Sequence, residues 1–299
     1  MDAIIIGGSF AGLSAALQLA RARRRVLLID AAEPRNRFAA HAHGFLGQDG
    51  VPPHVIRAGA RAQLAAYPTL RFHDGAATAA QCGQGGFVVT CADGSLHRAA
   101  RLVLATGVRD TLPNLPGLAE RWGRTVIHCP YCHGYELDGA PVGVLAGHEK
   151  SAHQALLLPD WGPTTFFTDG THEPDAQALA LLAARGVVVE RTPVVALLGD
   201  APGLTGVRLA DGRTVALGGL FVAPRTDPGP LARQLGCALD DGMTGPLVRV
   251  DALQQTSVPG VFAAGDAATQ MHNATLAAAA GVMAGVAVHQ SLVMAAATR

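Results

Sequence analysis

Short apolar runs alternate with glycine-rich turns and helical segments along the chain, a pattern typical of α/β proteins. An apolar strand is expected at Ala3–Ile6, followed by the turn Gly7–Gly12 and a helix that ends near Arg21. A second apolar strand, Val26–Ile29, ends on Asp30. Because a strand, a helix and a strand in this order form a βαβ unit, the pattern predicts a parallel sheet.

The same pattern begins again in the middle of the chain. A strand is expected at Pro141–Ala146, a helix near Ser151–Leu158 and another strand at Thr164–Phe167. The proline-rich segment Leu112–Gly117 marks a boundary, and the chain is expected to return to the first unit near Asp241–Gly245. The predicted fold class is therefore α/β, with two Rossmann-like (three-layer ββα) domains, the second inserted into the first. The expected boundaries are residues 1–113 with 245–299 for the first domain and 117–241 for the inserted domain.

Composition and charge limit the class of protein. The chain has 299 residues, of which 49% are hydrophobic and 15% charged, so it is expected to bury a large core. A net charge of zero argues against nucleic acid or an acidic membrane surface as the main partner. The apolar segment Ala274–Val288 is expected to be a buried helix, because it is too short to span a bilayer.

The chain contains five cysteines, of which only Cys129 and Cys132 are closely spaced. An odd number with one close pair, and no signal peptide before Ala3–Ile6, indicate a reducing compartment, so a cytoplasmic location is expected. The other three are interpreted as structural: Cys82, Cys91 and Cys237.

The first turn fits a dinucleotide-binding fingerprint. Gly7 permits a tight turn, Gly12 lets strand and helix approach, and Ser9 stands where a middle glycine is usual. The N-terminus of the helix would then face a pyrophosphate, and Asp30 could hold a ribose hydroxyl pair. An alternative is a hydrolase in which Ser9 is the nucleophile on a sharp strand-to-helix turn.

The segment Cys129-Pro-Tyr-Cys132-His133 carries the most specific chemistry. Two thiols three residues apart can close a small disulfide and cycle between dithiol and disulfide by moving two electrons. His133 could transfer protons beside them, because the pKa of an imidazole lies near neutrality. The spacing also fits covalent haem attachment, zinc binding or a buried structural pair, although haem attachment needs export and zinc needs further ligands. No metal site is expected, since His41, His43 and His54 are irregularly spaced in a loop.

Together, these motifs resemble the low-molecular-weight thioredoxin reductases, and the likeness covers nearly the whole chain. The matching segments are Gly7–Gly12 with Asp30, Ala105-Thr106-Gly107, Cys129–Cys132 and Thr256–Asp266. The resemblance implies an FAD-binding domain, an inserted pyridine-nucleotide domain and a homodimer. It also implies that Cys132 lies against the flavin ring, that Cys129 exchanges with the substrate, and that Gly265-Asp266 contacts the ribityl chain.

Two histidines stand where many members of that family have other residues. His133 replaces an acid–base aspartate after the second cysteine, and His272-Asn273 replaces an Arg-Gln pair near the flavin. The catalytic residues implied are Cys129, Cys132, His133 and His272. The cofactor-binding residues implied are Gly7, Ser9, Phe10, Ala11, Gly12, Asp30, Arg37, Ala105, Thr106, Gly107, Gly265, Asp266, His272, Asn273 and Ala274.

The nucleotide turn of the second domain departs from the family pattern. Gly147-His148-Glu149-Lys150-Ser151-Ala152 stands where Gly-x-Gly-x-x-Ala is usual, so Glu149 puts a carboxylate where a phosphate would lie. The segment after the next strand, Phe167-Thr168-Asp169-Gly170, is acidic, and negative charge near a phosphate weakens its binding. The sequence therefore argues against NADPH as a ligand.

These departures and the segment Cys-Pro-Tyr-Cys-His-Gly-Tyr-Glu resemble FAD-dependent dithiol oxidases, which close disulfides in small metabolites and pass electrons to dioxygen. This resemblance implies that Cys129 and Cys132 oxidise a small-molecule dithiol to a disulfide. Three alternatives stay open: a thioredoxin reductase-type enzyme that reduces a thioredoxin-like protein, a flavin-bearing redox sensor, and the hydrolase built on Ser9.

Overall fold

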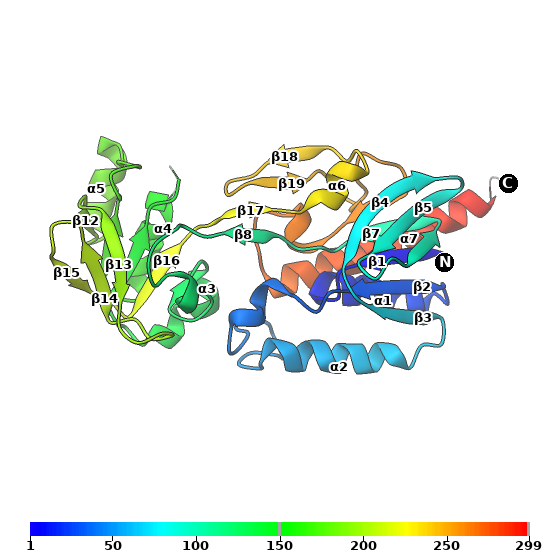
Figure 1. Ribbon diagram of the computed structural model, residues 1–299, viewed down its shortest axis with the longest axis horizontal. Helices are drawn as coiled ribbons and strands as arrows, with labels where there is room; N and C mark the ends of the chain where they lie inside the picture. The colour runs from blue at the N-terminus through cyan, green and yellow to red at the C-terminus, as the bar shows by residue number, and fades with distance from the viewer. Residues whose placement is uncertain (149–150, 298–299) are drawn as a thin grey trace.

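The computed structural model describes residues 1–148 and 151–297, which form two α/β domains (Figure 1). Two antiparallel strands, β8 (Arg109–Thr111) and β17 (Arg225–Asp227), connect them. The chain leaves the first domain through β8 and returns through β17, so the second domain is inserted into the first. This arrangement confirms the predicted fold class.

A five-stranded parallel sheet lies at the centre of the first domain, in the order β20-β7-β1-β2-β3. Its strands are β1 (Ala3–Ile6), β2 (Val26–Asp30), β3 (Leu70–Asp74), β7 (Arg101–Leu104) and β20 (Val261–Ala263). Strands β1 and β2 are buried along their whole length, which explains why they are apolar without alternation.

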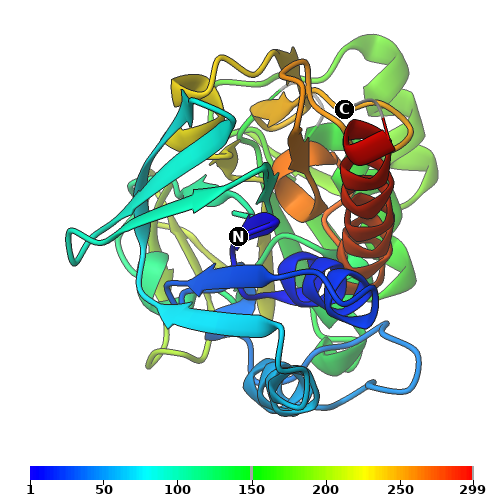
Figure 2. The ribbon, with the colours of Figure 1, turned by 90° about the vertical axis from the view of Figure 1, so that its right-hand side faces the viewer.

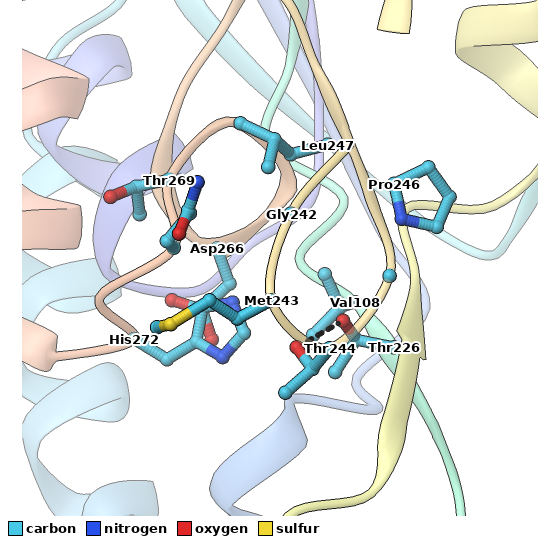
Figure 3. A pocket seen from close by; sticks show the side chains of 12 residues that line it. Val108, Thr226, Gly242, Met243, Thr244, Pro246, Leu247, Asp266, Thr269 and His272 are labelled. Carbon is cyan, nitrogen blue, oxygen red and sulfur yellow. Dashed lines mark hydrogen bonds between the residues drawn. The ribbon is translucent and has the colours of Figure 1, made fainter. Parts of the chain in front are cut away.

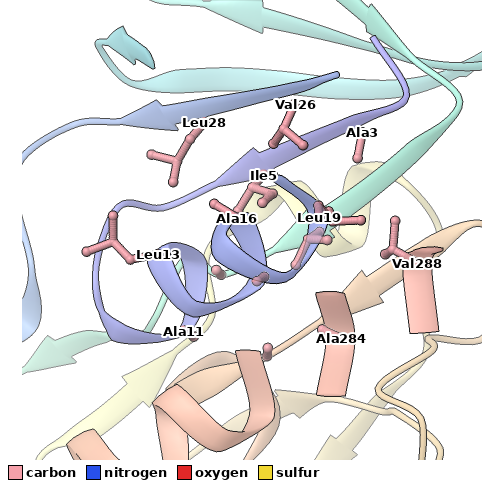
Figure 4. Close-up of a cluster of buried hydrophobic side chains, with 14 of the residues drawn as sticks. Ala3, Ile5, Ala11, Leu13, Ala16, Leu19, Val26, Leu28, Ala284 and Val288 are labelled. Carbon is pink, nitrogen blue, oxygen red and sulfur yellow. The ribbon is translucent and has the colours of Figure 1, made fainter. Parts of the chain in front are cut away.

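Helices cover one face of this sheet, and a small antiparallel sheet covers the other (Figure 2). On the helical face, α1 (Phe10–Arg21) and α7 (Ala274–Ala297) pack on Ile5 and Leu28 (Figure 4). Another helix of this domain, α2 (Pro53–Ala65), contributes Leu64 to the same cluster. The opposite layer consists of β4 (Ala77–Gly83), β5 (Gly86–Cys91) and β6 (Leu96–Ala99).

The inserted domain repeats this three-layer plan around a parallel sheet in the order β12-β11-β10-β16-β9. An antiparallel β13-β14-β15 sheet packs on one face, and helices α4 and α5 pack on the other. The strands are β9 (Val126–Ile127), β10 (Val142–Leu145), β11 (Thr164–Phe167), β12 (Val188–Glu190), β13 (Val194–Leu198), β14 (Gly206–Leu209), β15 (Thr214–Ala216) and β16 (Gly219–Val222). The helices are α3 (Pro130–His133), α4 (Ser151–Leu157) and α5 (Ala176–Ala184).

The segment after β17 packs with the first domain, which differs from the expected boundary at residue 241. Its elements are α6 (Pro230–Gln234), β18 (Leu239–Asp241) and β19 (Pro246–Val248). Leu231 and Cys237 share a core cluster with Ile4 of β1, so the apolar side of this segment is buried against the first sheet. The inserted domain therefore ends at β17. Short 3₁₀ turns lie at Arg35–Phe38, Ala119–Arg121, Tyr135–Leu137, Leu158–Asp160 and Gly265–Ala268.

Helix α7 continues to Ala297, so the expectation that its apolar stretch is too short to span a bilayer was wrong. Its 24 residues are long and apolar enough to cross a membrane by length and composition, and it is the one such helix within the described ranges. Packing against α1 accounts for the glycines on one face of this helix. A Cβ on Gly281 would overlap the carbonyl oxygen of Ala11, and one on Gly285 would lie 2.7 Å from that of Ala15. The glycine face of α7 therefore belongs to the core of the first domain.

Candidate active site

The turn between β1 and α1 leaves backbone room for a phosphate. Gly7 has φ +114°, and a Cβ on Gly12 would overlap the carbonyl oxygen of Gly7. Ser9 is the N-cap of α1, and within the described part of the chain its side chain makes no capping hydrogen bond. The hydroxyl of Ser9 and the first N–H groups of α1 can therefore turn to an anion. This cradle fits the diphosphate of a dinucleotide.

Asp30 lies beside this turn at the end of β2. Its Oδ2 accepts a hydrogen bond of 2.8 Å from Arg57 Nη2, and its Oδ1 accepts one of 3.0 Å from the N–H of Ala32. Arg57 also donates to the carbonyl oxygen of Gly8 at 3.1 Å. The carboxylate is thus held where a ribose would follow the diphosphate. The sequence did not single out Arg57, because a lone arginine on a helix carries no motif.

Arg35 is the centre of a charged cluster. Its Nε and Nη2 donate to the two oxygens of Asp110 at 2.8 and 2.5 Å, and its Nη1 lies 3.5 Å from Asp266 Oδ2. The side chains of Arg35 and Asp110 are only 14% and 8% exposed, so water screens this pair little. Asp110 belongs to β8 and Asp266 follows β20. One guanidinium therefore joins the connection between the domains to a predicted cofactor-binding residue.

His272 contacts the same guanidinium, with its Nδ1 2.5 Å from Arg35 Nη1. Since arginine can only donate, Nδ1 accepts and the ring carries its proton on Nε2. Burial lowers the pKa of His272, Asp266 opposes this shift and Arg35 adds to it. With Nδ1 as an acceptor, the ring of His272 is neutral and carries its proton on Nε2, and a hydrogen bond with the backbone of Thr269 raises its pKa. The next residue, Asn273, begins α7 by accepting hydrogen bonds from the N–H groups of Thr275 and Leu276 at 2.8 and 3.2 Å.

Cys129 and Cys132 form a disulfide at the start of α3, with their Cα atoms 5.3 Å apart. Cys129 is the N-cap, and Pro130 occupies the first helical position, where its missing N–H costs nothing. Helix α3 lies on the side of the inserted domain that faces the first domain (Figure 1). The sequence-predicted pair is therefore a closed disulfide that faces the predicted cofactor-binding domain.

His133, the last residue of α3, lies close to the first domain. The centres of the His133 and His43 rings are 6.4 Å apart. Nε2 of His43 lies 3.4 Å from Glu136 Oε1, and its Nδ1 lies 3.6 Å from Asp49 Oδ1. Burial lowers the pKa of His133, whereas Glu136 raises it. An imidazole whose pKa is lowered by burial thus follows the disulfide, and His43 and two carboxylates lie between it and the solvent.

His128, which precedes Cys129, lies close to charged side chains of both domains. Burial holds its pKa well below the usual range, and the charges of Arg35, His272 and His133 lower it further. Arg35 and His272 belong to the first domain, whereas His128 and His133 belong to the inserted one. The structure therefore brings the disulfide segment to the Arg35 cluster.

The remaining predicted cofactor residues are distributed around the cradle, with one exception. Gly265 has φ +76°, and a Cβ there would lie 2.9 Å from that of Ala11. Thr106 donates to the carbonyl oxygen of Pro228 at 3.2 Å. Arg37, by contrast, stays in its own turn, where it donates to the carbonyl oxygen of Pro34 at 3.0 Å. The rest lie within or directly beside these segments: Phe10, Ala105, Gly107 and Ala274.

A small pocket opens beside the Arg35 cluster (Figure 3). Asp266 and His272 line one side, and the loop between β18 and β19, including Met243, lines the other. Thr226 and Thr244 close its floor through a hydrogen bond of 2.9 Å between their hydroxyls. Open space therefore borders the histidine that can donate from Nε2.

The nucleotide turn of the inserted domain is bonded to its own helix. The N–H groups of Gly147 and His148 donate to Ser151 Oγ at 3.1 and 3.2 Å, and Ser151 is fully buried. These two donors are therefore engaged within the chain. The predicted influence of Glu149 and Lys150 on this turn lies outside the described residues.

Comparison with known proteins identifies the family. The model of the pyridine nucleotide-disulphide oxidoreductases matches residues 1–153 and 165–281. The chain belongs to this family. Thioredoxin reductase aclD of Aspergillus oryzae is 32% identical, with 97% of this chain and 96% of that protein covered. Thioredoxin reductase sirT of Leptosphaeria maculans is also 32% identical, with 96% and 93% covered.

Two solved structures extend the likeness to the whole fold. An oxidoreductase from Agrobacterium tumefaciens is 52% identical with a TM-score of 0.93, over 98% of each chain. HlmI is 38% identical with a TM-score of 0.92, over 100% of this chain and 95% of its own. The chain is accordingly a thioredoxin reductase-like, FAD-dependent disulfide oxidoreductase, which confirms the resemblance seen in its sequence.

Proposed function

We propose that this oxidoreductase converts a small-molecule dithiol into a disulfide through Cys129 and Cys132, with dioxygen as the final electron acceptor. The observation that carries this choice is the nucleotide turn of the inserted domain, where Ser151 already accepts the N–H groups of Gly147 and His148. A pyridine nucleotide would have to displace these bonds before its diphosphate could reach the turn.

The charges around this turn support the same conclusion. Asp169 follows β11, the strand position where an acidic residue favours an unphosphorylated ribose. Two cations near the adjacent strand β12 are already paired with carboxylates. Arg213 lies 2.8 Å from Glu190, and Arg191 lies 2.6 Å from Glu173. The described part of the turn thus offers little to the 2′-phosphate of NADPH.

The chemistry of the proposed reaction is a thiol–disulfide exchange. One sulfur of the substrate attacks Cys129, Cys132 leaves as a thiolate, and the second substrate sulfur then displaces Cys129 to release the cyclic disulfide. Two electrons and two protons thereby pass from the substrate to the cysteine pair. When bound, FAD would take these electrons from the reduced Cys129–Cys132 pair and deliver them to dioxygen, giving hydrogen peroxide.

Residues of this chain would bind FAD and manage the protons. The cradle from Gly7 to Gly12 would hold the diphosphate, and Asp30 the ribose. Neutral His133 can take a proton from the incoming thiol, and His43 can pass it toward Glu136. His272, which carries its proton on Nε2, lines the adjacent pocket.

A second function, reduction of a protein disulfide with electrons from NADPH or another donor, has its own support. Tyr131 and Tyr135 beside the disulfide are 70% and 85% exposed, and such aromatic side chains can contact a protein partner. Relatives named thioredoxin reductases point the same way.

We further propose that the protein is a homodimer located in the cytoplasm. Analytical ultracentrifugation and cell fractionation would test these two proposals.

Anaerobic mixing separates the two functions. The FAD-loaded protein should lose its yellow colour with a small dithiol such as dithiothreitol but not with NADPH. Admission of air should then restore the colour and produce one hydrogen peroxide per dithiol oxidised. The Cys132→Ser variant should not be bleached, whereas Cys82→Ser, at an exposed free cysteine, should behave as the parent. Rapid bleaching by NADPH would establish the reductase instead.

A further inference from the structure

Three side chains that bind metals well converge at a place remote in sequence from the disulfide. His73 lies on β3, Cys91 ends β5 and His97 lies on β6. One ligand atom from each lies within 4.8 Å of the others. No local pattern predicts this cluster, because the sequence indicates a structural role for Cys91 and the two histidines fit no metal motif.

Strand alternation explains why the three meet. Phe72 packs against the helical face of the central sheet, so the next residue, His73, points to the face that β5 and β6 cover. Cys91 is 2% exposed and belongs to the cluster on that same face. His97 lies opposite Val89 of the same β5 strand. The cluster thus lies between two layers of the first domain.

The histidines have lone pairs to offer. Nε2 of His73 is shielded from solvent, lies 3.6 Å from Asp93 Oδ2, and has no hydrogen-bond partner among the described residues. The hydroxyl of Ser95 donates its proton to Asp93 Oδ1 at 2.7 Å. Toward His97 Nε2, 3.1 Å away, the hydroxyl oxygen can therefore only act as an acceptor, so Nε2 carries the proton of the His97 ring. This assignment leaves Nδ1 of His97 unprotonated.

We propose that His73, Cys91 and His97 bind one Zn²⁺ ion, with Asp93 or a water molecule as the fourth ligand. Imidazole nitrogen and thiolate sulfur are the ligands that zinc prefers, in a tetrahedral arrangement with bonds of about 2.0–2.3 Å. Such bonds bring ligand atoms to about 3.6 Å from one another, so the side chains need to close by about 1 Å. Rotation about χ1 and χ2 allows this.

Binding exchanges a proton for the metal. An ordinary cysteine thiol carries its proton at neutral pH, whereas zinc binds the thiolate. The Cys91 S–H bond breaks, a Zn–S bond forms, and one proton leaves to solvent without any change of oxidation state. The hydrogen bonds that join Asp93 to Ser95 and Ser95 to His97 would orient the His97 ring, as carboxylates behind zinc ligands commonly do.

The ion would link the edge strand β3 to the sheet that covers it. His73 lies opposite Ile29 and Asp74 lies opposite Asp30, so the site borders the strand end that presents Asp30. A metal ion that binds the folded protein but not the unfolded chain raises the unfolding temperature. We therefore expect the zinc ion to stabilise the fold, and its binding does not depend on the substrate of the Cys129–Cys132 pair.

Cobalt titration of the FAD-loaded, chelator-treated protein tests the proposal, with the Cys129–Cys132 disulfide kept closed so that it cannot bind metal. One equivalent of Co²⁺ should give intense d–d absorption bands in the red part of the spectrum, a region in which oxidised flavin does not absorb. One equivalent of Zn²⁺ should abolish these bands. Cys91→Ser should weaken Zn²⁺ affinity by about 100-fold or more. Cys82→Ser, on the neighbouring strand β4, should leave the affinity unchanged.

A second variant guards against misfolding of the buried cysteine site. His97→Gln keeps a polar side chain on β6 and should fold, because residue 97 is only half-buried. It should also weaken Zn²⁺ affinity by about 100-fold and lose the zinc-dependent rise in unfolding temperature. Failure of the parent to bind one equivalent, or unchanged affinity in either ligand variant, would overturn the proposal.

Discussion

Nη1 of Arg35 lies 2.5 Å from Nδ1 of His272, although the two residues are 237 positions apart in the chain. This contact fixes the tautomer of His272, because a guanidinium cannot accept a hydrogen bond. The same side chain grips Asp110 on the strand that leaves the first domain. Arg35 therefore sets both the proton position at the candidate site and the anchoring of the connection between the domains.

Replacing Arg35 with leucine should damage stability and activity together. The carboxylate of Asp110 would be left buried without its cation, which costs about 3–5 kcal/mol. The pKa of His272 should rise, because Arg35 lowers it and Asp266 would remain. Urea unfolding and the pH profile of anaerobic flavin bleaching by a dithiol measure these effects.

Arg37→Leu is the matched control for that experiment. Arg37 is exposed and donates to Pro34 within its own turn, so its loss should change stability by less than about 0.5 kcal/mol. If Arg37→Leu lowered stability and shifted the pH profile as strongly as Arg35→Leu, the Arg35 cluster would not explain the site. A loss of FAD affinity in Arg37→Leu would support the cofactor role predicted for Arg37 from the sequence.

Neutralising Glu136 should change the pH dependence of the thiol chemistry. The carboxylate of Glu136 raises the pKa of His133 against the effect of burial, so Glu136→Gln should lower it. Since the neutral imidazole is the base, the acid limb of the bleaching rate should move to lower pH. Stopped-flow rates across pH 5–8 follow this shift.

Asp138→Asn removes the same charge two residues away. Asp138 has φ +50°, a conformation that asparagine tolerates well, so the fold should not change. An equal displacement of the acid limb in this variant would mean that a general surface charge, not the contact of Glu136 with His43, governs His133.

The elements that the sequence predicted well are those whose pattern depends on local burial. Ala3–Ile6 and Thr164–Phe167 are strands with the expected bounds, because an apolar run between turn residues has few other uses. Arg35 and Arg37 show the opposite case. Both lie in the same short turn, but Arg35 meets partners far away in the chain, such as Asp110, 75 residues away, and these contacts hold it at the site. Side chains gathered from distant strands, such as His73 and Cys91, leave no local pattern either.

His128 should make the protein less stable in acid. Its pKa in the folded state lies well below the ordinary value of 6.5, so the unfolded chain binds a proton that the folded chain excludes. The stability is fully present above pH 6.5 and falls as the pH drops below it, by at most about 1.4 kcal/mol per pH unit for one group. His128→Phe should flatten this slope in urea unfolding between pH 5 and pH 7. His54→Phe, at an exposed histidine on α2, should leave the slope as it is.

Two glycine substitutions should have opposite effects on stability. In Gly281→Ala the new methyl group overlaps the backbone of Ala11, so α1 and α7 must separate, at a cost of about 1–3 kcal/mol. In Gly59→Ala, in the middle of α2, no described atom lies within 4 Å of the new methyl group, and alanine favours the helix by up to about 1 kcal/mol. Helix α1 also carries the turn that ends at Gly12, so Gly281→Ala should release FAD at a lower urea concentration, seen as a rise in flavin fluorescence. Equal stability of the two variants would show that α7 is not seated on α1 through its glycine face.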